Sequence, residues 1–401
     1  MTQVRSISIG VWLTRGSRHE TAERGGIAHF VEHMLFKGTG TRTAEDIAQA
    51  IDSIGGQLDA FTAKEYASYY IKVLDEHLPL AIDILSDIVR NPAFSPDDIE
   101  REKKVVLEEI KMVEDTPDDL VHEMFVTAFW PDHPLGRPIL GTKRSLTSFD
   151  RQALASFFRS VYRPANILIS AAGHLDHESV SALMHRHFEG LGPGGRTRTG
   201  TPPRPAARIV TRSKKELEQV HMVLGTRAYP QTHEDRYGTY ILNTVLGGSM
   251  SSRLFQNIRE KRALVYSISS GVSAYSDAGA LTVYAGTSLD SVDEVVRLTV
   301  EELRKMKGDR LPEDELRRAK DHLKGSLMLS LENTGSRMSH LARQEIYFGR
   351  RFTLDEIIAG IEKVQADDVQ RIADDLFTGD LTISVLGNLG RYRPRAAQLR
   401  V

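Results

Sequence analysis

The pattern of apolar and polar positions along the chain occurs twice, so that the second half follows the same order of elements as the first. Each half begins with an alternating stretch typical of a strand, RSISIGVWLTRGS at 5–17 and EQVHMVLGTRAYP at 218–230. An apolar helical stretch that ends in glycine comes next, GIAHFVEHMLFKG at 26–38 and RYGTYILNTVLGG at 236–248. Such internal duplication predicts two domains of the same fold.

The later elements of the two halves also correspond. In each half two strands with small turn residues come next, and a long amphipathic helix follows them. Pro96 and Pro312 then stand at the expected start of a charged helix, where proline is favoured, and each half closes on a strand. Because strands and helices come in blocks, the predicted class is α+β, with two homologous α/β-roll domains, each a mixed, largely antiparallel sheet packed with helices.

The two halves are separated by a segment rich in glycine and proline, EGLGPGGRTRTGTPPRPAARIVTRSKK. These residues block regular structure, and the polar remainder cannot form a core. A chain of 401 residues also exceeds what one hydrophobic core usually supports. We therefore predict a first domain at 1–188, a linker at 189–215 and a second domain at 216–401.

Composition narrows the function classes. The chain has 52 basic and 54 acidic residues and a net charge of −2, so no overall field favours nucleic acid or an anionic membrane. It contains no stretch of roughly 18 apolar residues, the length that a membrane span needs. The absence of cysteine excludes disulfides and cysteine-ligated metals, and it fits a bacterial cytoplasmic location. Any metal site must use His, Asp or Glu.

The predicted helix at 26–38 carries two histidines and a glutamate, His29, Glu32 and His33, in an otherwise apolar run. Positions i and i+4 share a helix face, so both imidazoles can point at one ion with the glutamate beside them. This arrangement suits a catalytic zinc with a carboxylate base, although one ligand is missing. The alternative is a helix whose imidazoles are hydrogen-bonded in the core, but that arrangement would desolvate three polar groups without structural gain.

The order His-x-x-Glu-His inverts the common zinc-helix motif. With GIAHFVEHMLFKGT, GGQLDAFTAKEY, EREKKVVLEEI, HPLGRPILGT and SSRLFQNIREKRALVYS, the chain resembles the pitrilysin and insulin-degrading peptidases. It is most similar to their shorter bacterial members, which are like mitochondrial processing peptidase. The resemblance spans nearly all of both halves. It implies a zinc-dependent metalloendopeptidase that cleaves short or unfolded peptides in an enclosed chamber, with Glu32 activating water.

The resemblance also implies the missing zinc ligand. Counting from His33 in the way the family does leads to Glu109, and a second family glutamate, which would orient an imidazole, corresponds to Glu102. The neighbouring Glu108 is the alternative ligand, although it points about 100° away around the helix. In the second half, the stretch that matches the metal helix contains neither His nor Glu, so one metal site per chain is expected.

Substrate contacts are implied in both halves. The strand that follows the metal helix can pair with an extended peptide, and the family contacts peptide there through an Asn-Ala pair, which is Asp59-Ala60 in this chain. The aspartate keeps the acceptor but loses the amide donor. In the second half, Arg259 and Tyr266 match family residues that stabilise the oxyanion. The alternative for the first site is an ordinary core strand, and the alternative for the second is a salt-bridged arginine and a half-buried tyrosine.

Two further expectations concern assembly. Larger relatives enclose their chamber with four such domains and this chain has two, so we expect a homodimer with active sites shared between subunits. Family members usually begin with a short strand before the one that matches RSISIGVW, and the absence of that strand would remove one edge of the first sheet. The alternative function is a noncatalytic scaffold or regulatory subunit of a processing complex.

Overall fold

The computed structural model describes residues 1–190 and 200–401, which form two compact units. Unit 1 comprises Met1–Met112, Arg137–Thr201 and Leu329–Arg351, and unit 2 comprises Val113–Gly136, Pro202–Met328 and Phe352–Val401. The predicted domain boundaries follow the order of the sequence. Each observed unit, by contrast, contains one segment from the other half of the chain.

The sheet of unit 1 has four antiparallel strands in the order β2-β3-β1-β4. Alternating side chains of β1 define its two faces: Ile7 and Ile9 are buried in the main core, whereas Ser8 and Trp12 face the opposite side. This period of two is what the sequence pattern predicted. The strands are β1 (Ser6–Leu13), β2 (Gln57–Thr62), β3 (Ala67–Leu74) and β4 (Ile167–Gly173).

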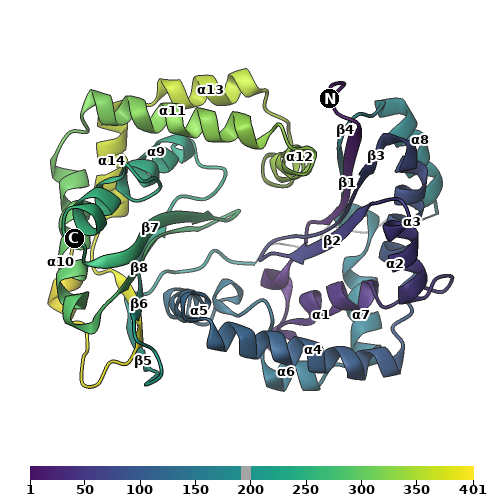
Figure 1. Ribbon diagram of the computed structural model, residues 1–401, viewed down its shortest axis with the longest axis horizontal. Coiled ribbons are helices and arrows are strands. Elements are labelled where there is room, and N and C mark those ends of the chain that lie inside the picture. The colour runs from purple at the N-terminus through teal and green to yellow at the C-terminus, as the bar shows by residue number, and fades with distance from the viewer. Residues whose placement is uncertain (191–199) are drawn as a thin grey trace. The chain divides into compact units, whose positions relative to one another are not determined.

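Helices cover both faces of this sheet (Figure 1). Helix α3 packs on β1 and β3 over the main core, and α12, which comes from the second half of the sequence, covers the other face along β1 and β4. The helices of unit 1 are α1 (Ile27–Leu35), α2 (Ala44–Asp52), α3 (Leu78–Arg90), α4 (Pro96–Asp115), α6 (Lys143–Thr147), α7 (Arg151–Val161), α8 (His177–Phe188) and α12 (Thr334–Phe348).

The sheet of unit 2 has five strands in the order β5-β9-β6-β8-β7, with β5 parallel to β9 and the other pairs antiparallel. The strands are β5 (Ile209–Ser213), β6 (Val220–Ala228), β7 (Val265–Ala274), β8 (Gly279–Thr287) and β9 (Thr382–Gly387). Four of them repeat the pattern of unit 1, with β6, β7, β8 and β9 in the places of β1, β2, β3 and β4.

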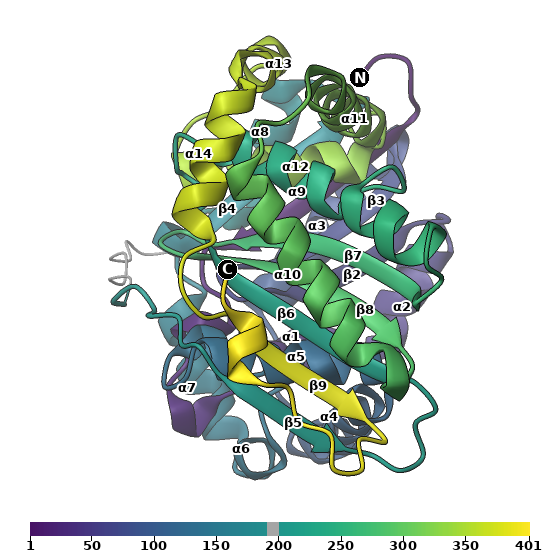
Figure 2. The same cartoon turned by 90° about the vertical axis from the view of Figure 1, so that its left-hand side faces the viewer.

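Helices also cover both faces of the second sheet. Figure 2 shows α10 and α14 over one face, and α5, which comes from the first half of the sequence, packs on β6 and β9 over the other. The helices of unit 2 are α5 (Pro117–Phe129), α9 (Arg236–Leu246), α10 (Val292–Gly308), α11 (Glu313–Ser330), α13 (Leu354–Lys363) and α14 (Ala366–Leu376). The predicted fold class, two α+β domains related by duplication, is confirmed.

The predicted linker differs from the structure at its C-terminal end. Residues 191–199 lie outside the described residues, but Ile209–Ser213 form strand β5, which pairs with β9. Ile209 and Val210 directly follow a proline-rich stretch. The prediction judged the segment by its overall composition and therefore missed the short strand. Strand β5 is the additional strand of the second sheet, and among the described residues the sheet of unit 1 has no counterpart to it.

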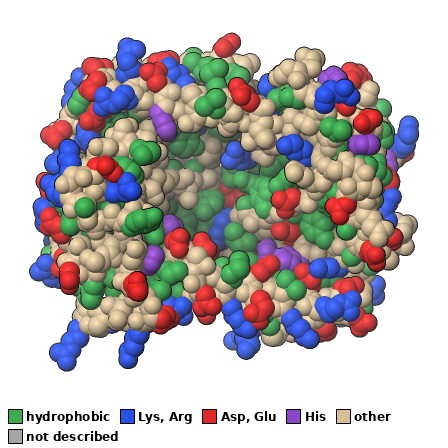
Figure 3. All heavy atoms as spheres, in the orientation of Figure 1, with side chains coloured by type: hydrophobic (Ala, Val, Ile, Leu, Met, Phe, Trp, Pro, Cys, Tyr) green, Lys and Arg blue, Asp and Glu red, His purple; other side chains and the backbone are tan. Residues whose placement is uncertain are grey.

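In the part of the chain that the structure describes, neither the helices nor the surface charge indicates a membrane-spanning or strongly charged protein. Among the described residues, no helix combines the length and the apolar character that a membrane crossing requires. On the face drawn in Figure 3, acidic and basic side chains are interspersed, as expected from the nearly balanced composition.

Candidate metal centre

Helix α1 is fixed at its start by backbone and side-chain contacts. Gly26 precedes the helix with a φ of 91°, and a Cβ at this position would lie 2.6 Å from the carbonyl oxygen of Leu140. The buried carboxylate of Glu20 accepts hydrogen bonds from the backbone N–H groups of Gly26 (2.8 Å) and Ala28 (2.7 Å). The apolar face of the helix is buried in the core. These contacts fix the direction in which its polar side chains point.

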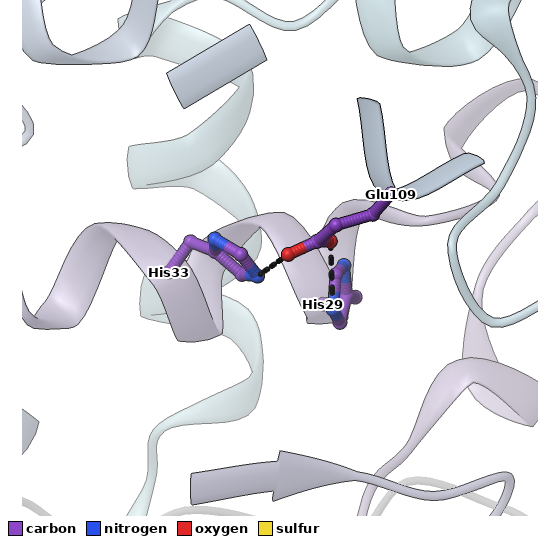
Figure 4. A group of neighbouring side chains, drawn as sticks. All are labelled: His29, His33 and Glu109. Atoms are coloured by element: carbon purple, nitrogen blue, oxygen red, sulfur yellow. Dashed lines mark ion pairs between the residues drawn. The ribbon is translucent and has the colours of Figure 1, made fainter. Parts of the chain in front are cut away.

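His29 and His33 of α1 meet Glu109 of α4 in one cluster (Figure 4). Nε2 of His29 lies 3.7 Å from Oε2 of Glu109, and Nε2 of His33 lies 3.4 Å from Oε1. One donor atom from each residue lies within 4.8 Å of the other two. Two imidazole nitrogens and a carboxylate oxygen form the ligand set of a catalytic zinc site.

The hydrogen bonding of the cluster fits a bound cation. The separations of 3.4 and 3.7 Å exceed ordinary hydrogen-bond lengths. Oε2 of Glu109 is buried and has no hydrogen-bond partner among the described residues. Buried carboxylate oxygens are rarely left unpaired in native proteins, and a metal ion coordinated by the three side chains would satisfy this one.

Glu102, one helical heptad before Glu109, supports His33 from behind. Its side chain is 4% exposed and accepts hydrogen bonds from Nδ1 of His33 (2.8 Å) and Nζ of Lys37 (2.8 Å). Burial tends to raise the pKa of Glu102, but these two bonds outweigh it and the pKa is lowered, so the carboxylate stays charged. With Nδ1 of His33 engaged in this way, Nε2 faces the cluster.

The pKa values of the two histidines are shifted in opposite directions. Burial, together with the neighbouring His33, lowers the pKa of His29 to about 4, so this imidazole is neutral at pH 7. Burial also tends to lower the pKa of His33, but the bond to Glu102 and the charge of Glu109 outweigh it and the pKa is raised. A metal ion would therefore displace a proton chiefly from His33.

Glu32 lies between the two histidines in sequence and belongs to the same buried region. Burial raises the pKa of its carboxyl group to about 6, although a hydrogen bond from Thr62 acts in the opposite direction. Oγ1 of Thr62, the last residue of β2, donates this bond to Oε2 of Glu32 over 2.5 Å. A carboxyl group with a pKa of about 6 can accept and return a proton near neutral pH.

Glu108, the alternative ligand, points away from the cluster. Its side chain is 71% exposed and pairs with Lys111 on the same helix over 2.6 Å. Thus the structure brings Glu109, and not Glu108, to the two histidines.

Asp59 and Ala60 lie on β2, the edge strand of the first sheet. The exposed carboxylate of Asp59 accepts hydrogen bonds from the N–H of Ala60 (2.8 Å) and from the hydroxyl of Tyr70 (3.0 Å). Within the described residues β2 pairs with β3 alone, so its other edge presents backbone groups that an extended chain could bind.

Arg259 and Tyr266 lie in unit 2, whereas the metal cluster lies in unit 1. Arg259 belongs to a π-helical turn, Phe255–Glu260, and its Nε donates to the backbone carbonyl of Tyr266 over 2.9 Å. The Tyr266 side chain, on the edge strand β7, is 77% exposed. The two residues are therefore neighbours, and the Tyr266 side chain is mostly exposed.

Sequence reasoning missed two residues of the site, Thr62 and Lys37. Thr62 lies two positions after Ala60, so the strand period places both on the same face of β2. Lys37 lies one helical turn beyond His33 in sequence. Those spacings could have identified both residues as neighbours of the site, but not their hydrogen bonds to Glu32 and Glu102.

Comparison with known proteins identifies a family and several relatives. Residues 2–143 match the family profile Insulinase (Peptidase family M16), and residues 148–323 match the profile Peptidase M16 inactive domain. A relative from Bacillus subtilis, named uncharacterized zinc protease YmxG, is 44% identical over 387 residues, which are 96% of this chain and 94% of the relative. A Mycobacterium leprae relative, also named an uncharacterized zinc protease, is 42% identical and covers 99% of this chain and 90% of its own.

Two solved structures share the fold. A protease from Helicobacter pylori has a TM-score of 0.88 at 22% identity, covering 95% of this chain and 94% of its own. A Pseudomonas fluorescens structure described as a peptidase M16 inactive domain has a TM-score of 0.90 at 19% identity, covering 98% and 95%. At these identities the similarity establishes the two-domain fold.

Proposed function

The chain belongs to the insulinase family of peptidases, M16, and we propose that it is a zinc-dependent metalloendopeptidase that hydrolyses short or unfolded peptides in an enclosed chamber. The observation that carries the proposal is the convergence of His29, His33 and Glu109 next to Glu32. The relatives named zinc proteases are bacterial, and the chain has no cysteine, so a bacterial cytoplasmic location is part of the proposal.

Each residue of the cluster has a distinct part in this reaction. Bound zinc would supply Lewis acidity, which lowers the pKa of water and polarises the peptide carbonyl. His29, His33 and Glu109 would hold the ion, and Glu102 keeps His33 in the orientation that presents Nε2. Glu32 takes the proton from the attacking water and later gives it to the leaving amine. The support for that role is the pKa of Glu32, which burial raises to about 6.

The substrate would bind as an additional strand on the free edge of β2. Main-chain hydrogen bonds to the backbone of Asp59 and Ala60 would hold the peptide, so binding would depend little on substrate sequence. Arg259 and Tyr266 would donate hydrogen bonds to the developing oxyanion. The support for this role is that the Tyr266 phenol is exposed and that Arg259 holds the backbone of the same residue.

We include a homodimer in the proposal. The metal cluster and the pair Arg259 and Tyr266 belong to different units, and the first domain of one subunit would face the second domain of its partner. Each active site would then draw on both subunits.

The experiment that tests the function is a comparison of wild type with Glu32→Gln. Purified wild type should hold about one zinc per chain and cleave an unstructured peptide, whereas the variant should keep the zinc and lose activity by orders of magnitude. A folded wild type that binds no zinc after reconstitution would refute the metal centre. A zinc-loaded wild type without peptidase activity on a diverse peptide library would favour the noncatalytic scaffold instead.

A further inference from the structure

The carboxylate of Glu32 has one protein partner in the described part of the chain, the hydroxyl of Thr62. Oγ1 of Thr62 donates to Oε2 of Glu32 over 2.5 Å, and the Glu32 residue is 9% exposed. A hydrogen bond to a charged acceptor in such a buried place is strong and directional. It holds one carboxylate oxygen and leaves the other free to meet a reacting water.

Thr62 is a rigid anchor for this bond. It ends β2, where it stands opposite Ala67 of β3. Directly after it, the backbone carbonyls of Ala63 and Lys64 accept hydrogen bonds from the N–H groups of Ser17 (3.1 Å) and Arg18 (2.7 Å). Both sides of Thr62 are thus fixed to neighbouring backbone. Glu32, by contrast, has a flexible side chain with three torsions, whose orientation has to be restricted by a partner.

Among the described residues, the hydroxyl of Thr62 has one hydrogen-bond partner, Glu32. Valine has almost the same shape as threonine, and both are favoured in strands. The hydroxyl of Thr62 adds only the bond to Glu32. A threonine at this partly exposed strand end therefore keeps a shape that suits a strand and adds a donor for the glutamate.

We propose that Thr62 is a positioning residue that fixes the Glu32 carboxylate in the orientation for proton transfer. This inference rests on the proposed function, because it assigns Thr62 a role in the same reaction. Thr62 acts through Glu32 and transfers no proton itself. Its loss should lower kcat and leave KM and zinc binding close to wild type, since its hydroxyl bonds to Glu32 and to none of the three metal-ligand residues.

The test compares Thr62→Val, which removes the hydroxyl, with Thr62→Ser, which keeps it. On fully zinc-loaded protein, Thr62→Val should lower kcat by about tenfold to a hundredfold, the range expected for losing a hydrogen bond to a charged group, with KM within about twofold. Thr62→Ser should recover most of the kcat. If the valine variant does not fold, Thr62→Ala compared with Thr62→Ser serves the same purpose.

Thr39→Val is the matched control. Oγ1 of Thr39 donates to the buried Oδ2 of Asp87 over 2.7 Å, so this variant also loses a threonine-carboxylate bond in unit 1. It should lower the melting temperature and leave kcat unchanged. A kcat loss in Thr39→Val as large as in Thr62→Val would overturn the inference, because stability would then explain both. So would wild-type kcat in Thr62→Val, or a serine variant as impaired as the valine variant.

A crystallographic readout separates this inference from the proposed function. In zinc-loaded crystals, the Glu32 carboxylate should have one orientation in wild type and a different or mixed orientation in Thr62→Val. An unchanged orientation would overturn the role of Thr62 whatever the activity. If Glu32 changes its orientation in Thr62→Val as expected but zinc-loaded wild type cleaves no peptide, the proposed function is contradicted and the positioning role is kept.

Discussion

Replacing Glu102 with glutamine should weaken zinc binding, although this residue is not a ligand. The buried carboxylate accepts hydrogen bonds of 2.8 Å from both His33 and Lys37. Glutamine has nearly the same shape but is neutral, and one end of it is a donor that would face the donor of His33 or of Lys37. The imidazole of His33 then loses the charged partner that fixes its orientation and increases its basicity.

The size of the effect follows from the two bonds. A hydrogen bond to a charged acceptor contributes about 1.5–3 kcal/mol and a neutral one about 0.5–1.5 kcal/mol. The hydrogen bond to His33 involves a zinc-ligand residue, so losing it lowers the zinc affinity directly. The loss of a fixed imidazole orientation lowers the affinity further. We therefore expect zinc affinity to fall by about tenfold to a hundredfold, or about 1.4–2.7 kcal/mol.

The assay is competition for zinc with a chromophoric chelator at a temperature far below unfolding. Glu108→Gln is the matched control, because it is the same substitution on the same helix at a side chain that is 71% exposed. It should change the affinity by less than about twofold. Glu109→Gln should weaken binding more than Glu102→Gln, since it removes a charged ligand. Wild-type affinity in Glu102→Gln would refute the orienting role, and a larger loss in Glu108→Gln than in Glu109→Gln would reassign the third ligand.

Three further predictions follow from the same structure. The apparent zinc affinity should fall about tenfold for each pH unit below the raised pKa of His33, because zinc displaces one proton from His33 whereas His29 is already neutral. A chelator titration in which the affinity falls about a hundredfold per pH unit would contradict this prediction. Met338→Ala, at a residue that is 1% exposed, should lower the free energy of unfolding by about 2–5 kcal/mol, measured by urea denaturation. The control Met328→Ala, at a residue of α11 that is 52% exposed, should have little effect. Mixing Glu32→Gln with Tyr266→Phe subunits should restore part of the peptidase activity, and heterodimers without recovery would refute a shared site.

Much of the fold and part of the site could be predicted from local pattern. The duplicated order of strands and helices predicted two similar sheets, because strand and helix periods are local properties. The spacing of His29 and His33 placed both on one helix face for the same reason. Glu109 lies on a separate helix, and no period connects residues so far apart in sequence, so its assignment needed the resemblance to a family.

The exchange of helices between units could not be predicted in this way. The apolar stripe of an amphipathic helix shows that one side is buried but not which sheet buries it. Helix α5 lies within the first half of the sequence and packs on the second sheet, and α12 lies within the second half and packs on the first sheet. The hydrogen bond between Thr62 and Glu32 could not be predicted from local pattern either, because it depends on how the end of a strand packs against a helix.

The exchanged helix α12 explains why the second half cannot be treated only as a source of substrate contacts. Oγ of Ser8 and Oγ1 of Thr334 are 2.8 Å apart, and Oγ of Ser170 donates to the backbone carbonyl of Met338 over 2.8 Å. Both serines are buried on the sheet that carries the metal helix, so removing α12 would expose that face and unpair these groups. Deleting the second half would therefore damage the metal-bearing unit itself, and inactivity of such a fragment would not identify a catalytic role for Tyr266. Single substitutions on β7, which leave α12 in place, separate the contribution to folding from the contribution to chemistry.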